Sequence, residues 1–474
     1  MRRAALAIFT LIAALKDLIA MRRPGSLIVR RLPARWIFLA AFALGAAALS
    51  ADWAAAGGLI RGGAVGGILI DADGVVSTPE VGDAAQLLAA WQSGLAAVPA
   101  ELAPYTDLRF VSLKGLEQQI AECREAGRPL PDAVRYCAGL LRVKYVLVYP
   151  ERNDIVLAGP AEGWKVDRLG NTVGETTNRP VLFLEDLIVG LRAAEDSSAT
   201  ISCSIDPTRE GLARVQQVNS QLTAAMGPAE AARRIEQALG PQTVSVTGIP
   251  ADSHFARVIV AADFRMKRLA MNFEPAPISG LVSYLDMLPS RPNTKNMLPR
   301  WWLATDYQPL LRDADGLAWE LRGPGVKCMT EEDFVNAEGD RTRSGKSSPV
   351  AQRWADKLSE QYEELADHDS AFGHLRNVMD AAVVGAVIAK GELIRRTGAS
   401  LPWLMEKEEL EQYPAPREVA SQASFIKKGR NWIISASGGV QMFPWEIADR
   451  NEESAEVAKV RDTVAKAPSN WWWQ

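Results

Sequence analysis

Histidine is scarce in this chain: its 474 residues include only His254, His368 and His374. His368 and His374 are six residues apart, whereas zinc ligands on a helix typically stand about three to five residues apart. The chain also lacks a Gly-x-Ser-x-Gly nucleophile elbow and a Cys-x-x-Cys pair. The sequence therefore predicts no metal site, no cofactor and no catalytic residue, and it leaves open whether the protein is an enzyme.

Cysteine is almost as rare. The four residues are Cys123, Cys137, Cys203 and Cys328. Cys123 and Cys137 are 14 residues apart and could close a local loop in an oxidising compartment. Buried free thiols are the other interpretation. Both interpretations stay open at the level of sequence.

A complete phosphate-binding loop is missing as well. The stretch "RSGKSS" (343–348) resembles the end of such a loop, but the first glycine of the motif would stand at position 340, which is Asp340. No apolar strand precedes it. Residues 337–349 are polar and rich in turn formers, so they are predicted to be a linker.

The stretch "GILIDADGVVST" (67–78) resembles the first motif of the haloacid dehalogenase superfamily. That resemblance would make Asp71 a nucleophile and Asp73 a general acid. However, Asp-Ala-Asp-Gly occurs again at 313–316, also between apolar runs. Asp and Gly are typical of tight turns between strands. One explanation, turn formation, covers both copies and is the favoured one.

The N-terminal segment has the organisation of a leader. Basic residues at 30–35 precede the apolar run 36–50, and "ADWAAAGG" follows. A basic region, an apolar core and an Ala-x-Ala site are typical of a secretory signal peptide. Residues 1–56 are therefore predicted to be a signal peptide cut after Ala56, which would make the protein exported, either periplasmic or secreted.

Two alternatives remain for this end of the chain. A second apolar stretch, 4–20, leaves open whether translation starts at Met1 or Met21, and the leader could instead be an uncleaved anchor. The later run "AAVVGAVIA" (381–389) is too short for a membrane span and is predicted to be a buried helix. Membrane contact is thus expected only through an uncleaved leader.

Charge argues against nucleic acid as a partner. The full chain has a net charge of −4, and residues 1–56 carry eight Lys/Arg and two Asp/Glu, so removing them would leave −10. An acidic protein repels the phosphate backbone. No nucleic-acid partner is therefore expected.

Beyond the leader, the pattern predicts an α+β fold: mixed sheet layers with packed helices and hairpins, and a helical C-terminal section. We divide it into an N-terminal α/β region (57–196), a central α/β region (197–340) and a C-terminal helical region with a terminal hairpin (341–474). Residues 131–143 are predicted to form a helix, and 144–160 a hairpin around "PERND".

The segment 254–271 is predicted to be a helix with two apolar faces. Arg257, Arg265 and Arg268 fall in the remaining arc, with His254 beside them at the N-terminal end. These four residues could bind an anion. The alternative is a structural face held by ion pairs, and this is the favoured interpretation.

Four stretches occur in this order: "YVLVYPERNDIVLAGPAEGWKVD" (145–167), "RPVLFLEDLIVGLR" (179–192), "CSIDPTREGLARVQ" (203–216) and "HFARVIVAADFRMKRLAM" (254–271). Together they resemble a bacterial family of exported proteins catalogued as domain of unknown function 1598. The resemblance extends over residues 60–390. It carries no established activity, so it implies no catalytic residue.

Within the first stretch, "AGPAEGW" (158–164) could present Glu162 and Trp164 to a ligand, or could simply be the exit of a hairpin. The sequence thus predicts an exported binding or scaffolding protein of the bacterial cell envelope, with an unknown ligand or envelope protein as its partner. The alternative is an envelope hydrolase whose active site the sequence does not locate. A pocket that gathers perturbed carboxylates or His254 would favour the hydrolase.

Overall fold

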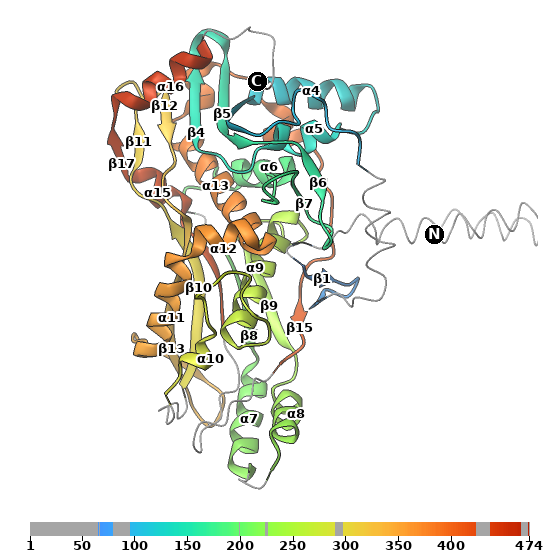
Figure 1. Cartoon of the computed structure of the whole chain (residues 1–474), viewed down its shortest axis with the longest axis vertical. Helices are drawn as coiled ribbons and strands as arrows, with labels where there is room; N and C mark the ends of the chain where they lie inside the picture. Colours follow the sequence, from blue (N-terminus) through green and yellow to red (C-terminus); the bar gives the residue numbers. More distant parts are fainter. Residues whose placement is uncertain are drawn as a thin grey trace, which may run out of the picture. The chain divides into compact units, whose positions relative to one another are not determined.

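The computed structural model describes residues 65, 67–78, 95–198, 200–222, 226–289, 297–422, 437–465 and 473 (Figure 1). These residues all belong to one compact unit, 62–474. The predicted leader (1–56) and the first arm of the predicted terminal hairpin lie outside the described residues. The protein has an α+β fold, as the sequence predicts.

The larger sheet has nine strands. In sheet order they are β1 (Leu69–Ile70), β2 (Val75–Ser77), β15 (Glu418–Val419), β9 (Gln242–Thr247), β8 (Ile201–Pro207), β16 (Ser437–Met442), β10 (Met297–Asp306), β13 (Gly325–Val335) and β14 (Arg341–Arg343). β16 lies between β8, to which it is antiparallel, and β10, to which it is parallel. The second arm of the predicted terminal hairpin is therefore a central strand of this sheet.

The second sheet has six strands. In sheet order they are β17 (Asn451–Glu453), β11 (Leu310–Arg312), β12 (Ala318–Glu320), β4 (Tyr145–Tyr149), β5 (Asp154–Ala161) and β3 (Thr106–Ser112). A small separate ribbon joins β6 (Trp164–Val166) to β7 (Thr172–Gly174). Both larger sheets combine strands from all three regions that we distinguished in the sequence, and β14 lies within the predicted linker.

Helices pack around these sheets (Figure 1). They are α4 (Leu113–Glu125), α5 (Asp132–Arg135), α6 (Leu184–Ala193), α7 (Arg209–Gln221), α8 (Pro228–Leu239), α9 (His254–Ala270), α10 (Tyr284–Met287), α11 (Pro349–Glu360), α12 (Tyr362–His368), α13 (Ser370–Lys390), α14 (Leu393–Thr397), α15 (Pro444–Asp449) and α16 (Ala455–Ala465). Helix α9 contacts β8, β16 and β10 on one face of the nine-stranded sheet and α13 on its other side.

Helix α13 joins the two main cores. Phe372 and Val378 belong to the core around α9, whereas Val384 and Val387 belong to the core around α4 and α6. A helix that is apolar on all sides is typically buried, so the predicted buried helix is confirmed. Helices α6 and α13 cross closely, because a Cβ on Gly385 would lie 2.3 Å from the Gly190 carbonyl oxygen. No helix among the described residues is long and apolar enough to cross a membrane.

Local turn chemistry also appears as predicted. The Asp71 carboxylate accepts hydrogen bonds of 2.9 Å from the backbone N–H groups of Asp73 and Val75, between β1 and β2. In the second copy, the Asp313 carboxylate accepts from Leu317 (2.6 Å) and Ala318 (3.0 Å), between β11 and β12. Both carboxylates hold turns, which confirms the turn interpretation.

The first turn gives a direct test. Gly74 has φ of +86°, and a Cβ there would lie 2.4 Å from the Ala415 carbonyl oxygen. Gly74→Val should lower the free energy of unfolding by about 1–3 kcal/mol, because a β-branched residue resists positive φ. Asp71→Asn should cost little, since the amide oxygen can accept the same bonds. Urea denaturation compares the two variants. A metal-dependent phosphatase activity lost in Asp71→Asn would contradict this interpretation.

The hairpin predicted at 144–160 is confirmed as β4 and β5, joined by the turn Pro150–Arg152. The helix predicted at 131–143 is wrong over most of its length. Only α5 forms, because Cys137 (φ +45°) and Ala138 (φ +54°) adopt left-handed backbone angles that end it. All four cysteines are free and buried.

Candidate functional site

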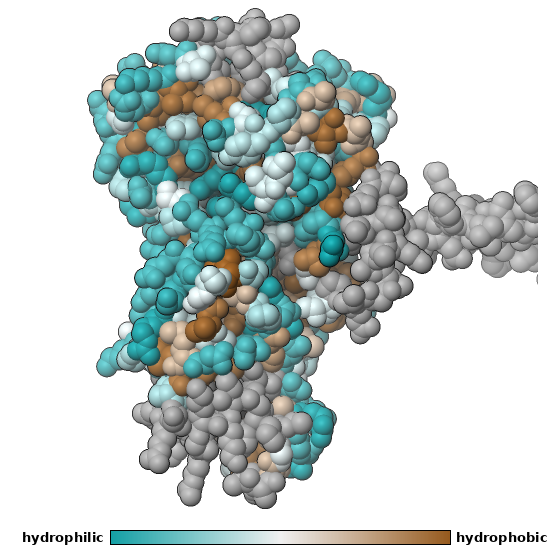
Figure 2. Space-filling view, in the orientation of Figure 1, coloured by the Kyte–Doolittle hydropathy of each residue, from teal (hydrophilic) through white to brown (hydrophobic). Residues whose placement is uncertain are grey.

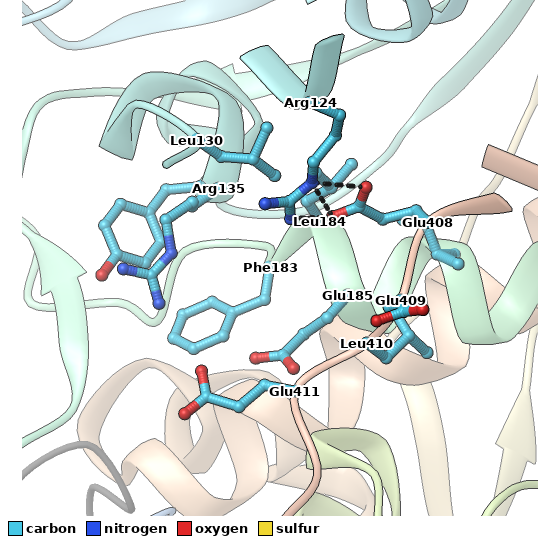
Figure 3. Close-up of a pocket in the computed structure, with 12 residues that line it drawn as sticks. Arg124, Leu130, Arg135, Phe183, Leu184, Glu185, Glu408, Glu409, Leu410 and Glu411 are labelled. Carbon is cyan, nitrogen blue, oxygen red and sulfur yellow. Dashed lines mark hydrogen bonds and ion pairs between the residues drawn. The ribbon is translucent and has the colours of Figure 1, made fainter. Parts of the chain in front are cut away.

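A pocket of about 110 Å³ lies between α4, α5, α6 and the segment 408–411 (Figure 3). Its lining combines basic, acidic and apolar side chains. They are Arg124, Leu130, Arg135, Tyr136, Phe183, Leu184, Glu185, Ile188, Glu408, Glu409, Leu410 and Glu411. We call it the charged pocket.

Helix α6 brings two carboxylates to this place. It begins at Leu184, after Phe183, and carries Glu185 and Asp186 in its first turn. Acidic side chains there are stabilised by the unpaired N–H groups and the dipole of the helix. The following turns are apolar and buried in the cores. The helix is therefore fixed, and with it the position of both carboxylates.

Asp186 holds His254, the first residue of α9. The His254 Nδ1–H donates to both Asp186 oxygens, at 3.0 and 2.9 Å. Burial alone lowers the pKa of His254, but the Asp186 carboxylate outweighs it, and the net pKa is raised. The Phe183 ring stacks on the His254 ring with centroids 4.5 Å apart. His254 is thus a buried, oriented imidazole directly behind the aromatic wall of the charged pocket.

Glu185 lines the charged pocket, and its pKa lies well above that of an ordinary glutamate. Burial raises its pKa to about 7, with Asp186 adding to this and His254 opposing it. The Tyr413 hydroxyl donates to Glu185 at 3.0 Å. The Tyr413 ring in turn contacts Arg257, which is 1% exposed and whose guanidinium carbon lies 4.9 Å from the ring centroid. A carboxyl group that titrates near neutral pH can exchange a proton or accept a cation.

The segment from Glu408 to Tyr413 crosses the charged pocket and is tied at both ends. Glu408, 4% exposed, accepts from the Arg124 guanidinium, with Nε at 2.9 Å from the nearer oxygen. Its backbone carbonyl accepts from Arg192 at 3.1 Å. At the other end, the Tyr413 N–H donates to the Asp252 carbonyl at 2.8 Å. The exposed residues Glu409 and Glu411 therefore lie on a fixed segment.

Arg135 forms the opposite wall. In the view of Figure 3, the Phe183 ring lies between the Arg135 guanidinium and the Glu185 and Glu411 carboxylates. The Arg135 side chain is 49% exposed, and its ion pair with Asp132 is loose, at 3.8 Å. Burial lowers the pKa of Arg135, but nearby Tyr136 and the carboxylates, including Glu185 and Glu411, give a net increase. The two walls therefore carry opposite charges across an aromatic ring, with Arg135 on one side and Glu411 on the other, where Glu185 adds its charge once it ionises at about pH 7.

The pKa of Glu185 predicts a pH effect on stability. In the folded protein this carboxyl keeps its proton up to about pH 7, whereas an unfolded chain releases it near 4.5. Between these values the folded state binds more protons, so this group's contribution to stability falls as pH rises from about 4.5 through 7. Glu185→Gln, which still accepts a hydrogen bond from Tyr413, should therefore be more stable than wild type at pH 8. The expected gain is only about 1 kcal/mol, because the Glu185 side chain keeps some exposure to solvent.

Thermal unfolding of both proteins from pH 4 to pH 8 measures this effect. The gap should be small below pH 5 and should open as the pH rises through 7. Glu409→Gln, on the exposed rim of the same pocket, is the matched control and should show no such gap. A constant difference between Glu185→Gln and wild type at every pH would contradict the assignment.

The structure separates the residues that the sequence singled out. His254 and Arg257 lie beside the charged pocket. Arg265 donates to Asp369 at 2.8 Å and also pairs with Glu274, and Arg268 donates to Glu274 at 2.6 Å. The four residues of the predicted stripe therefore lie in two groups, and ion pairs within the protein occupy Arg265 and Arg268.

Glu162 and Trp164 are both buried, at 0% and 3% exposure. The Glu162 carboxylate accepts from the backbone N–H and the hydroxyl of Thr176 (3.0 and 2.5 Å) and from the same groups of Thr177. Burial raises the pKa of Glu162, but these bonds outweigh it, and the net pKa is lowered. Trp164 packs edge-on against Tyr136, with centroids 5.6 Å apart, so it supports the wall of the charged pocket from behind.

Sequence reasoning missed Arg135, Glu185, Glu411 and Tyr413. One local signal existed, since Glu185 and Asp186 interrupt the apolar run "VLFLEDLIVGL" at the start of a predicted helix. The other three carry no local signal. Among the described residues, no group of three or more His, Cys, Asp or Glu side chains could hold a metal ion.

Residues 203–284 match a family described as "Protein of unknown function (DUF1598)". This confirms the resemblance to that family over residues 203–284. The matched segment runs from β8 to α10 and contains two of the four stretches that suggested it, 203–216 and 254–271. Comparisons with curated proteins and with solved structures found no match.

Proposed function

We propose that the protein, whose residues 203–284 match a family of unknown function, is exported to the bacterial cell envelope. There it binds a small polar molecule in the charged pocket. The observation that carries this proposal is the pocket itself. Arg135 stands on one wall, Glu185 and Glu411 on the other, and aromatic and aliphatic side chains lie between them. Ligand sites typically combine apolar lining with a few converging polar groups.

On one face of the molecule, the described surface favours a small ligand over a broad scaffold contact. On the face drawn in Figure 2, the apolar residues among the described part form separate brown areas within a hydrophilic surface. Large docking faces usually expose a contiguous apolar area of several hundred Å². A pocket of opposite charges is thus the better-supported binding feature.

A steric block tests the binding proposal. Leu130 lines the charged pocket and is half-buried, so Leu130→Trp should fill it. Calorimetric titration with amino acids, alkylamines, carboxylates and neutral sugars should reveal at least one ligand class, and the block should weaken its binding about tenfold or more. Val282→Trp, at a residue that is 51% exposed outside the pocket, should bind like wild type. Binding that survives Leu130→Trp unchanged, or no binding at all, would refute the proposal.

Export rests on the basic, apolar and small-residue pattern at 22–56. N-terminal sequencing of the protein from the envelope fraction of a bacterial host should give a chain that starts at Gly57. A cytoplasmic protein that keeps an intact leader would exclude export.

One observation favours the second candidate, an envelope hydrolase. Glu185, whose pKa is raised by burial to about 7, lies beside the Asp186–His254 pair, and a carboxyl group of this kind can act as general acid or base. Fluorogenic peptides and glycosides are suitable substrates. A hydrolase should turn at least one of them over, and Glu185→Gln should abolish turnover. If the wild-type protein turns over none of them, this candidate is excluded.

A further inference from the structure

We propose that the ligand of the charged pocket is a zwitterion with an apolar side chain, an amino acid whose carboxylate binds Arg135 and whose ammonium group binds Glu185 and Glu411. This inference rests on the proposed function and adds the chemical class of the ligand. Three features of the pocket support it: the placement of the charges, the partners they already have, and the apolar surface between them.

Charge placement excludes ligands of a single sign. A simple cation would leave Arg135 facing it across the Phe183 ring, and a simple anion would face Glu185 and Glu411 (Figure 3). A molecule with both charges satisfies both walls at once. Separated opposite charges across one pocket are thus complementary to a zwitterion.

The contacts that these charged groups already make within the protein also favour a zwitterionic ligand. Arg124 and Glu408 neutralise each other within the protein. Within the described part of the chain, the Arg135 guanidinium has a loose ion pair with Asp132 at 3.8 Å and lies over the Tyr136 ring, 5.9 Å from its centroid. Neither contact occupies the two parallel N–H groups with which a guanidinium can hold a carboxylate. Glu411 is exposed on the rim. Glu185 accepts one hydrogen bond from Tyr413 and retains further acceptor capacity.

The surface between the charges is apolar. Leu130, Phe183, Ile188 and Leu410 all line the charged pocket. An aliphatic or aromatic side chain on the ligand would cover them, and burying this apolar surface would favour binding. Hydrophilic amino acids would leave this surface wet, so we expect phenylalanine or leucine to bind better than serine.

Three related probes separate the two charges: phenylalanine, 2-phenylethylamine, which lacks the carboxylate, and 3-phenylpropanoate, which lacks the ammonium group. Calorimetric titration should show phenylalanine, tested as both enantiomers, binding at least about tenfold more tightly than either analogue. A tenfold ratio corresponds to about 1.4 kcal/mol, which the loss of one charge-assisted hydrogen bond accounts for. Higher salt should weaken phenylalanine binding, since two charged contacts are screened.

Substitutions test which pocket residue binds the carboxylate of the ligand and which binds its ammonium group. Arg135→Gln should lower the affinity for phenylalanine and should raise that for 2-phenylethylamine, because the positive charge that faces the amine is lost. Glu411→Gln should weaken both phenylalanine and 2-phenylethylamine and should strengthen 3-phenylpropanoate, because a negative charge that faces the carboxylate is lost. Arg128→Gln and Glu406→Gln, at exposed residues outside the pocket lining, are the matched controls and should bind all three as wild type does.

The outcomes distinguish the two proposals. If 2-phenylethylamine binds as tightly as phenylalanine, the zwitterion is wrong, while the pocket remains a binding site. The same holds if no amino acid binds but another compound does so in a way that Leu130→Trp blocks. If no compound binds, the proposed function fails and the zwitterion with it.

Discussion

Asp380→Ala should lower the free energy of unfolding by about 3–5 kcal/mol, measured by urea denaturation. Asp380, on α13, is 0% exposed. It accepts from the Arg142 guanidinium at 3.1 and 3.2 Å and from the Tyr307 hydroxyl at 2.7 Å. Arg142 is itself only 6% exposed. Removing the carboxylate would leave a buried guanidinium without its counter-charge, and that is the source of the large cost.

Two further variants make this prediction specific. Replacing both partners, Arg142→Met with Asp380→Leu, should cost less than Asp380→Ala alone, because no buried charge is left unpaired. Glu230→Ala breaks an exposed pair with Arg233 and should change stability little, since water screens such pairs. If the double variant is less stable than Asp380→Ala, the ion pair itself stabilises the fold. The cost of leaving a buried charge unpaired would then not explain the loss.

Phe255→Ala should cost a similar ~3–5 kcal/mol. The side chain is 0% exposed in the core that α9 shares with the nine-stranded sheet and α13. Truncation leaves a cavity that the surrounding strands cannot close, because the sheet is held by its own hydrogen bonds. Phe264, which is 8% exposed, should give a smaller loss for the same change.

Chemical denaturation measures this loss, provided that the variants share the same m-value, and Tyr105→Ala is the control. Tyr105 is an aromatic residue that is 46% exposed, so its truncation should be nearly neutral. If Phe255→Ala is as harmless as Tyr105→Ala, α9 does not fill the core between the sheet and α13.

Elements defined by local chemistry could be predicted from the sequence. The two Asp-Ala-Asp-Gly turns, the hairpin of β4 and β5, and α9 with its two apolar faces all follow from residues close together in the chain. The helix predicted at 131–143 failed because hydrophobic spacing does not reveal the left-handed backbone at Cys137 and Ala138.

The candidate site depends on contacts that no local pattern encodes. Tyr413 donates to Glu185 across 228 residues of sequence, and Arg124 donates to Glu408 across 284. Loop-rich segments such as 408–413 have no periodicity that would predict which face they cover. Of the residues that the sequence singled out, His254 and Arg257 lie beside the charged pocket, and Trp164 supports its wall from behind. The amphipathic pattern of the helix restricted the direction of the first two.

The position of β16 determines when the nine-stranded sheet can be completed during synthesis. β8 and β10 are separated in the nine-stranded sheet by a strand that the ribosome makes more than 130 residues after β10 begins, at residues 437–442. Until that strand arrives, β8 and β10 both present open edges, which are prone to pair with other chains. A nascent chain released before residue 442, or a fragment limited to the matched residues 203–284, would lack the strand that closes this gap. Completion of the nine-stranded sheet therefore depends on residues 437–442, which follow most of its other strands in the sequence.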